Sequence, residues 1–171
     1  MIISLLGYMG SGKSHISKNL SRKINFPLVD LDQQISEELQ GSIPQIFKTK
    51  GEIYFRKEEK RILENLLSTE DNLILSLGGG TPVYYNNMEI INQKSTSIFL
   101  RASVNTLTKR VLLQRKSRPL ISNLDDSAVP EFIAKHLFER NPFYSQAHFT
   151  IDTDSKNAGE ICDDIIKSLQ I

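Results

Sequence analysis

Residues 1–14 of the chain read Met1-Ile-Ile-Ser-Leu-Leu-Gly-Tyr-Met-Gly-Ser-Gly-Lys-Ser14. The apolar run Ile2–Leu6 predicts a buried strand, and Gly7–Ser14 fits the pattern G-x-x-x-x-G-K-S of a phosphate-binding loop. Glycine allows backbone dihedrals that other residues avoid, so several N–H groups can converge on phosphate oxygens. Residues 14–24 place apolar side chains four positions apart, which is the spacing of one helix face. The strand–loop–helix context therefore predicts a nucleotide-binding loop.

Each polar residue of this loop has a chemical task in such a site. Lys13 supplies a mobile positive charge for the β- and γ-phosphates, and the hydroxyl of Ser14 is a ligand for Mg²⁺. The helix that follows points its positive end at the phosphates. The alternative is a glycine-rich turn, but average residue usage gives this pattern by accident in roughly one chain in a hundred or fewer. The predicted nucleotide contacts here are Gly10, Ser11, Gly12, Lys13, Ser14 and His15.

Length, composition and charge limit the classes of protein to which this chain can belong. The chain has 171 residues, 39% of them hydrophobic and 24% charged, with a net charge of +1. This suits a single domain, residues 1–171, and indicates neither disorder nor a nucleic-acid-binding charge. Cys162 has no partner for an internal disulfide and falls among isoleucines, which favours a buried helix position. No stretch is long enough to span a membrane, and we expect a cytoplasmic protein.

Two carboxylates follow the second predicted strand, Phe26–Asp30, in the sequence Asp30-Leu31-Asp32. Carboxylates two residues apart in extended backbone face the same side, at the strand end where open α/β sheets bind ligands. The alternative is that Asp32 caps a helix starting at Gln33. With a phosphate loop upstream we favour the functional reading. The third strand, 72–77, carries no terminal acid, so Asp30 is predicted to hold a Mg²⁺-bound water.

A charged helix residue and a glycine run come next. Arg56 lies beside apolar Phe55 on a helix expected from Gly51 to about Ser68, and Glu59 is spaced for an ion pair with it. On the residues alone, a solvated charge is the favoured reading of Arg56. Gly78–Gly80 directly follow the third strand and cost extra backbone entropy on folding. We expect something to approach this backbone closely, the alternative being an irregular tight turn.

A basic stretch without acids lies between residues 105 and 123. It has three readings: a solvated face, a nucleic-acid patch, or a flap that brings guanidinium charge over a transferring phosphoryl group. The patch lacks interleaved aromatic residues and overall basicity, so we favour the flap, with residues 116–127 as a lid. The basic residues are Lys109, Arg110, Arg115, Lys116 and Arg118.

The remaining pattern predicts the fold class. Strands at about 97–100 and 148–152 bring the total to five, and each strand alternates with helical segments. Such alternation predicts a parallel sheet covered on both faces, a three-layer α/β/α domain. Residues 32–68 and 116–127 are expected to be excursions, one holding a substrate and the other forming the lid. Pro142 should kink or end the helix predicted at 129–146.

Taken together, six segments resemble the shikimate kinase family in order and spacing over essentially the full chain. A phosphate loop is shared by many families, but Asp-x-Asp followed by Gly-Glu-x-x-Phe-Arg and a triple glycine is far more specific. The resemblance implies a P-loop kinase fold and ATP-dependent transfer of the γ-phosphate to the 3-hydroxyl of shikimate, toward chorismate and the aromatic amino acids. The segments are Gly7–Ser14, Asp30–Asp32, Gly51–Arg56, Gly78–Gly80, Arg118-Pro-Leu120 and Arg140-x-Pro-x-Tyr144.

The resemblance also implies roles for individual residues. The shikimate contacts are Asp32, Arg56, Gly79 and Arg140, and the catalytic residues are Lys13, Asp32 and Arg118. Mg²⁺ is held by Ser14 and, through water, by Asp30. Arg110 and the loop around Lys156 lie on the adenine side, although Arg110 and Arg115 compete as the arginine that stacks on adenine. Arg118 is also a nucleotide contact, because it neutralises the charge of the transferring phosphoryl group. We expect a monomer with no nucleic-acid or membrane partner.

Residue chemistry alone leaves two other functions open. One is a different P-loop small-molecule kinase, such as a gluconate- or nucleotide-type kinase, because fold and loop do not define the acceptor. The other is a non-catalytic ATP-binding regulator that touches nucleic acid through the basic stretch. A GTPase switch is disfavoured because the sequence contains no Asn-Lys-x-Asp segment.

Overall fold

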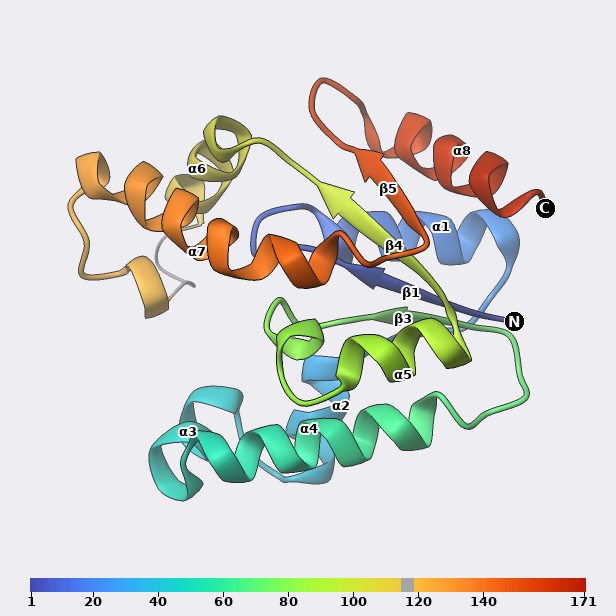
Figure 1. Cartoon of the computed structure of the whole chain (residues 1–171), viewed down its shortest axis with the longest axis horizontal. Coiled ribbons are helices and arrows are strands. Elements are labelled where there is room, and N and C mark those ends of the chain that lie inside the picture. The colour runs from blue at the N-terminus through green and yellow to red at the C-terminus, as the bar shows by residue number, and fades with distance from the viewer. Residues whose placement is uncertain (115–118) are drawn as a thin grey trace.

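A computed structural model describes residues 1–114 and 119–171 of the chain. Within these ranges the strands form one parallel sheet in the order β2-β3-β1-β4-β5 (Figure 1). The first strand is therefore central, as its wholly apolar sequence predicts for a parallel sheet buried on both faces. The strands are β1 (Ile2–Leu6), β2 (Leu28–Asp30), β3 (Leu73–Ser76), β4 (Thr96–Arg101) and β5 (Phe149–Asp152).

Helices cover both faces of this sheet, which confirms the predicted three-layer α/β/α arrangement. The helices α1 (Lys13–Ile24) and α8 (Ala158–Leu169) lie on one face, and α5 (Asn87–Lys94) and α7 (Val129–Tyr144) on the other (Figure 1). Three further helices, α2 (Leu31–Glu38), α3 (Ile43–Lys50) and α4 (Glu52–Leu66), follow β2. The helix α6 (Val104–Leu113) follows β4, and three short 3₁₀ turns are η1 (Thr81–Val83), η3 (Pro119–Ile121) and η4 (Asp126–Ala128).

The core is divided by the sheet into two apolar layers. Ile3 and Leu5 of β1 pack with residues of α1 and α8, among them Cys162, which is 1% exposed. Ile2 and Leu6 face the layer that contains α4, α5 and α7. Alternate strand residues thus serve opposite faces, and both sets are apolar because both faces are covered.

Most predicted helices and strands are present, with ends shifted by a few residues. The expected backbone around Asp32 was wrong. The chain leaves β2 at Asp30, whose side chain accepts a hydrogen bond from the Gln33 backbone N–H at 3.2 Å and caps α2. Asp32 therefore lies in the first helical turn, neither as the cap nor in extended backbone. Pro142 lies inside α7, which ends two residues later at Tyr144.

Within residues 1–114 and 119–171, every helix is too short or too polar to cross a bilayer. The predicted lid begins in the segment 115–118, which lies outside the described residues, as do Arg115, Lys116 and Arg118.

The packing of α4 gives a test of the core. Ile62 is 0% exposed and Ile53, on the same helix, is 73% exposed. Ile62→Ala is expected to lower the free energy of unfolding by about 2–5 kcal/mol, and Ile53→Ala by less than about 0.5 kcal/mol. Both changes carry the same gain in helix propensity, so their difference isolates burial. Urea denaturation measures both free energies of unfolding. An equal decrease in the two variants would contradict this placement of α4.

Candidate active site

The phosphate-binding loop has the backbone that its glycines predict. Gly7, Gly10 and Gly12 have φ values of 151°, 80° and 94°. A Cβ atom on Gly7 would lie 2.7 Å from the carbonyl oxygen of Leu100 in β4, so the loop packs directly against the neighbouring strand. The Lys13 ammonium donates to the carbonyl oxygens of Gly7 at 2.6 Å and Tyr8 at 3.1 Å. The lysine charge is thereby held beside the loop backbone.

A cavity of about 370 Å³ opens at this loop and brings many of the predicted residues together. Its lining comes from the start of α1, the end of β2, the segment after β3 and the second half of α6. Open α/β sheets bind ligands at this carboxyl edge. The predicted site residues among its lining are Gly10, Gly12, Lys13, Ser14, His15, Asp30, Asp32, Gly79 and Arg110. Ser11, also predicted, is 2% exposed and is not part of this lining.

Each glycine after β3 lies against one of the predicted acceptor contacts. A Cβ atom on Gly78 would lie 2.7 Å from Oδ1 of Asp32, and one on Gly80 would lie 2.9 Å from Nη2 of Arg56. A Cβ atom on Gly79 would lie 3.1 Å from Nη1 of Arg140. The expected close approach to this backbone is therefore confirmed. Side chains from α2, α4 and α7 converge on one three-residue segment.

Arg56 is buried, so the solvated reading favoured from sequence alone was wrong. Its side chain is 12% exposed, and Nη1 lies 2.9 Å from Oε2 of Glu59, itself 1% exposed. Glu59 also accepts a hydrogen bond from Thr81 Oγ1 at 2.8 Å. The predicted ion pair thus exists, and it lies beneath the glycine segment because α4 packs its Phe55 side into the core.

Three polar residues on one face of α7 connect the two loops of the site. His136, Arg140 and Tyr144 are spaced four apart, which puts them on the same side of the helix. The Tyr144 hydroxyl donates to the Gly79 carbonyl at 2.6 Å, and the ring of His136 hydrogen-bonds the Tyr8 hydroxyl at 3.0 Å through Nδ1. Helix α7 is therefore tied to the phosphate loop at one point and to the glycine segment at another.

Asp32 has an unusual charge environment. Its pKa is raised from 3.8 to about 6, first by burial and then by the neighbouring carboxylates of Asp30 and Glu59. The positive charges of Lys13 and Arg56 act in the opposite direction but are smaller influences. A carboxylate with such a pKa is mostly ionised at neutral pH and is a stronger base than an exposed aspartate. The position therefore suits proton acceptance from a hydroxyl group.

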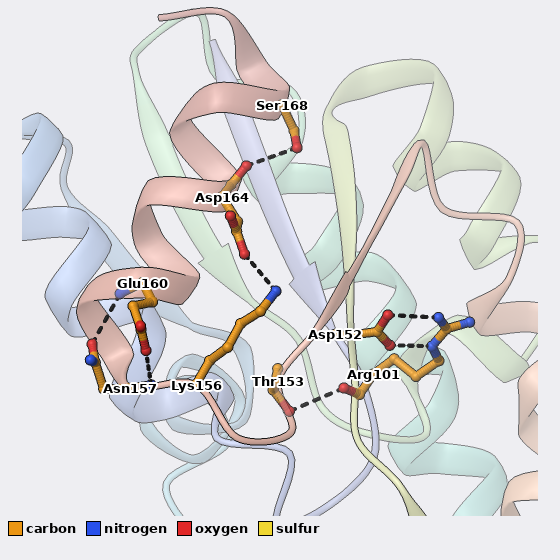
Figure 2. Close-up of polar contacts among 8 residues, drawn as sticks. All are labelled: Arg101, Asp152, Thr153, Lys156, Asn157, Glu160, Asp164 and Ser168. Atoms are coloured by element: carbon orange, nitrogen blue, oxygen red, sulfur yellow. Dashed lines mark hydrogen bonds and ion pairs between the residues drawn. The ribbon is translucent and has the colours of Figure 1, made fainter.

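Of the predicted adenine-side residues Arg110 and Lys156, only Arg110 lines the cavity. Its Nη1 donates to the Gly10 carbonyl at 3.2 Å. Lys156 instead extends along α8, where its ammonium lies 2.7 Å from Oδ2 of Asp164 (Figure 2). Among described residues, the cavity lining does not include Lys156. Its nucleotide role stays a prediction, as does the choice between Arg110 and Arg115, because Arg115 is outside the described residues.

The donor set fits a hard cation. Ser14 offers a hydroxyl oxygen and Asp30 a carboxylate in the same cavity, and Mg²⁺ prefers oxygen ligands. Among described residues, no group of three or more His, Cys, Asp or Glu side chains is placed to hold a metal.

Residues missing from the sequence-based site include Glu59 and Tyr84. Glu59 could have been identified from its spacing with Arg56, which predicts the ion pair but not its burial. Tyr84 follows η1 and lies with its ring centroid 3.9 Å from Cζ of Arg56. No local spacing in the sequence signals that contact, because the two residues come from different elements.

Comparisons with known proteins identify the family of this chain. The family model described as shikimate kinase matches residues 9–170. A shikimate kinase of Flavobacterium psychrophilum is 44% identical over 168 residues, covering 98% of both chains. That of Flavobacterium johnsoniae is also 44% identical, with the same coverage.

Solved structures of shikimate kinases share the fold of this chain over its full length. The crystal structure of shikimate kinase from Bacteroides thetaiotaomicron superposes with a TM-score of 0.93 at 31% identity, covering 100% of this chain and 99% of that one. Shikimate kinase from Acinetobacter baumannii, in complex with shikimate, gives 0.89 at 29% identity, covering 99% and 92%. On the matched family model and these relatives, the chain belongs to the shikimate kinase family.

Proposed function

We propose that the chain phosphorylates shikimate in the cavity where the glycine segment faces the phosphate loop. Membership of the family confirms the predicted class of activity, ATP-dependent phosphoryl transfer to the 3-hydroxyl of shikimate, with ATP and Mg²⁺. It also agrees with the predicted place in aromatic amino acid biosynthesis. The observation that carries the assignment of residues is the convergence of Asp32, Arg56 and Arg140 on Gly78–Gly80.

The acceptor side of the site combines two guanidinium groups with one carboxylate. Arg56 and Arg140 grip the carboxylate of shikimate, since arginine can offer paired N–H donors to a carboxylate. The Gly79 N–H donates to the acceptor, and Asp32 accepts from a ring hydroxyl. The Gly79 carbonyl is bound by Tyr144, which restricts the orientation of the glycine segment.

Asp32 orients and deprotonates the attacking hydroxyl. Its location beside the phosphate loop and its pKa of about 6 support this role, because the carboxylate is charged at neutral pH. The enzyme needs no stronger base, since phosphoryl transfer depends mainly on positioning and on stabilisation of charge.

The nucleotide side neutralises charge on the phosphates. The loop amides and Lys13 bind the phosphate oxygens, and Ser14 with a water on Asp30 holds Mg²⁺. The cation, when bound, neutralises phosphate charge. We retain Gly10, Ser11, Gly12, His15, Arg110 and Lys156 as nucleotide contacts and Arg118 as a catalytic residue of the lid.

The organisation of the chain is part of the proposal. Residues 1–171 form one kinase domain in which the segment 32–68 binds the acceptor and 116–127 closes over the site. Contacts of α2 and α4 with the glycine segment support the first assignment. We also propose a monomer that works in the cytoplasm without a nucleic-acid or membrane partner.

Removing a guanidinium should weaken acceptor binding. Arg56→Ala and Arg140→Ala are each expected to raise the KM for shikimate about 100-fold, since a charged hydrogen-bonding partner of a carboxylate is lost. The KM for ATP should change little. Steady-state kinetics measure both, with Arg61→Ala as the control because Arg61, on α4, is exposed and pairs with Glu58 of the same helix and with Glu38 of α2. If Arg140→Ala leaves the KM for shikimate unchanged, Arg140 does not bind the carboxylate of the acceptor.

Removing the ammonium group of Lys13 should lower kcat. Lys13→Ala is expected to lower kcat by roughly 10²- to 10³-fold, because the charge that stabilises the transferring phosphoryl group is lost. Lys18→Ala, an exposed lysine on the same helix, serves as the control and should leave kcat unchanged. A coupled assay of ADP release measures this, and a Lys13→Ala enzyme with normal kcat would contradict the assignment.

The raised pKa of Asp32 predicts the pH profile. At ATP concentrations well below saturation, where kcat/KM reports the ligand-free enzyme, kcat/KM for shikimate should fall about tenfold per unit below pH 6, because the protonated carboxyl cannot accept the proton. An aspartate of ordinary pKa would show this fall only below about pH 4. Asp32→Asn should abolish most activity and flatten the profile. If the wild-type profile instead has its inflection near pH 4, burial does not raise the pKa of Asp32 in the working enzyme.

A further inference from the structure

Arg56 is surrounded by contacts that its role as an acceptor ligand does not by itself require. Besides the ion pair with Glu59, the guanidinium has the ring of Tyr84 at 3.9 Å from Cζ to the centroid. The rings of Phe55 and Phe47 are more distant, at 5.1 and 5.8 Å. The backbone of Gly80 packs against the same guanidinium. Tyr84 is therefore the aromatic side chain in closest contact with it.

Tyr84 is itself fixed at both ends. Its hydroxyl donates to Oε1 of Glu52 at 2.8 Å, one helical turn before Arg56 on α4. Its backbone carbonyl accepts from the N–H of Asn87, and the Asn87 side chain donates to the carbonyl of Thr81 at 2.9 Å. Asn87 is 0% exposed, so the turn that carries Tyr84 is pinned from within the core.

One short segment thus reaches Arg56 by two routes. Thr81 hydrogen-bonds Glu59, which binds Nη1 of Arg56, and Tyr84, three residues later, contacts the guanidinium directly. Among the described residues, Nε of Arg56 is buried without a hydrogen-bond partner, and Oε1 of Glu52 forms a longer ion pair with it at 3.6 Å. Glu59 and Glu52 therefore restrain the edge of the guanidinium, and the Tyr84 ring adds a restraint on its face that these in-plane contacts cannot give.

We propose that Tyr84 is a positioning residue that holds the guanidinium of Arg56 in the orientation needed to bind the acceptor carboxylate. Arginine carries considerable rotamer entropy, and paired recognition of a carboxylate requires its planar donors at a defined angle. A ring stacked on the guanidinium restricts rotation and adds cation–π attraction. This inference rests on the proposed function of Arg56, and it assigns acceptor affinity in part to a residue that touches no substrate.

The neighbouring residue provides a matched control. Tyr85 is 54% exposed and has its ring 5.7 Å from Nζ of Lys60, on the solvent side of the same turn. Tyr84→Leu removes the aromatic face but keeps apolar volume, and Tyr84→Phe removes only the hydrogen bond to Glu52. Tyr85→Leu repeats the larger change one residue away.

The test is steady-state kinetics on these variants with shikimate and with its methyl ester, which lacks the negative charge. Tyr84→Leu should raise the KM for shikimate roughly 5- to 30-fold, the range expected for loss of a buried cation–π contact. Tyr84→Phe should raise it by a smaller factor. In both variants kcat and the KM for ATP should stay within about twofold, and the KM for the ester should be nearly unchanged. Tyr85→Leu should match the wild type throughout.

Two outcomes would overturn the inference while leaving the proposed function intact. If Arg56→Ala raises the KM for shikimate but neither Tyr84 variant does, Tyr84 does not position the arginine. If Tyr84→Leu raises the KM by the same factor in an Arg56→Ala background, it acts independently of Arg56. Should Tyr84→Leu fold poorly, Tyr84→Met, which also removes the aromatic face and keeps apolar volume, decides the question in its place. If Arg56→Ala itself has no effect on acceptor affinity, the proposed role of Arg56 fails first.

Discussion

The active site depends on close contact between a backbone without side chains and charged side chains from three helices. A Cβ atom at residue 78 or 80 would lie within 3 Å of Asp32 or Arg56, and one at residue 79 would lie 3.1 Å from Arg140. A larger residue at position 78 or 80 would therefore push a charged group away from this backbone. The entropic cost of three consecutive glycines is therefore offset by a compact cluster of charge that a normal strand end could not accommodate.

This cluster is stable because its charges are balanced locally. Glu59 is almost fully buried, and isolated burial of a carboxylate would be costly, but it is bound by both Arg56 and Thr81. Asp32 is less well compensated, since burial and two other carboxylates act on it together and raise its pKa. The site thus keeps one carboxylate poorly stabilised in its charged form, which is the property that a proton acceptor needs.

The proposed substrate contacts are held in place by a second set of residues. Tyr144 binds the carbonyl of Gly79, His136 binds the hydroxyl of Tyr8 in the phosphate loop, and Tyr84 stacks on Arg56. Preorganisation of this kind reduces the reorganisation needed when charge develops during phosphoryl transfer. The phosphate and acceptor subsites are consequently parts of one packed structure, with α7 in contact with both.

The sequence by itself determined the phosphate loop and the alternation of strands and helices, because these follow from short local patterns, whereas most of the proposed site residues came from the resemblance to a family. It also marked Gly78–Gly80 as a place of close approach without saying what approaches. Only the tertiary structure decided that Arg56 is buried, that Asp32 sits in a helical turn and that Tyr84 contacts Arg56. Those properties depend on packing between elements distant in the chain, and no residue spacing encodes such contacts.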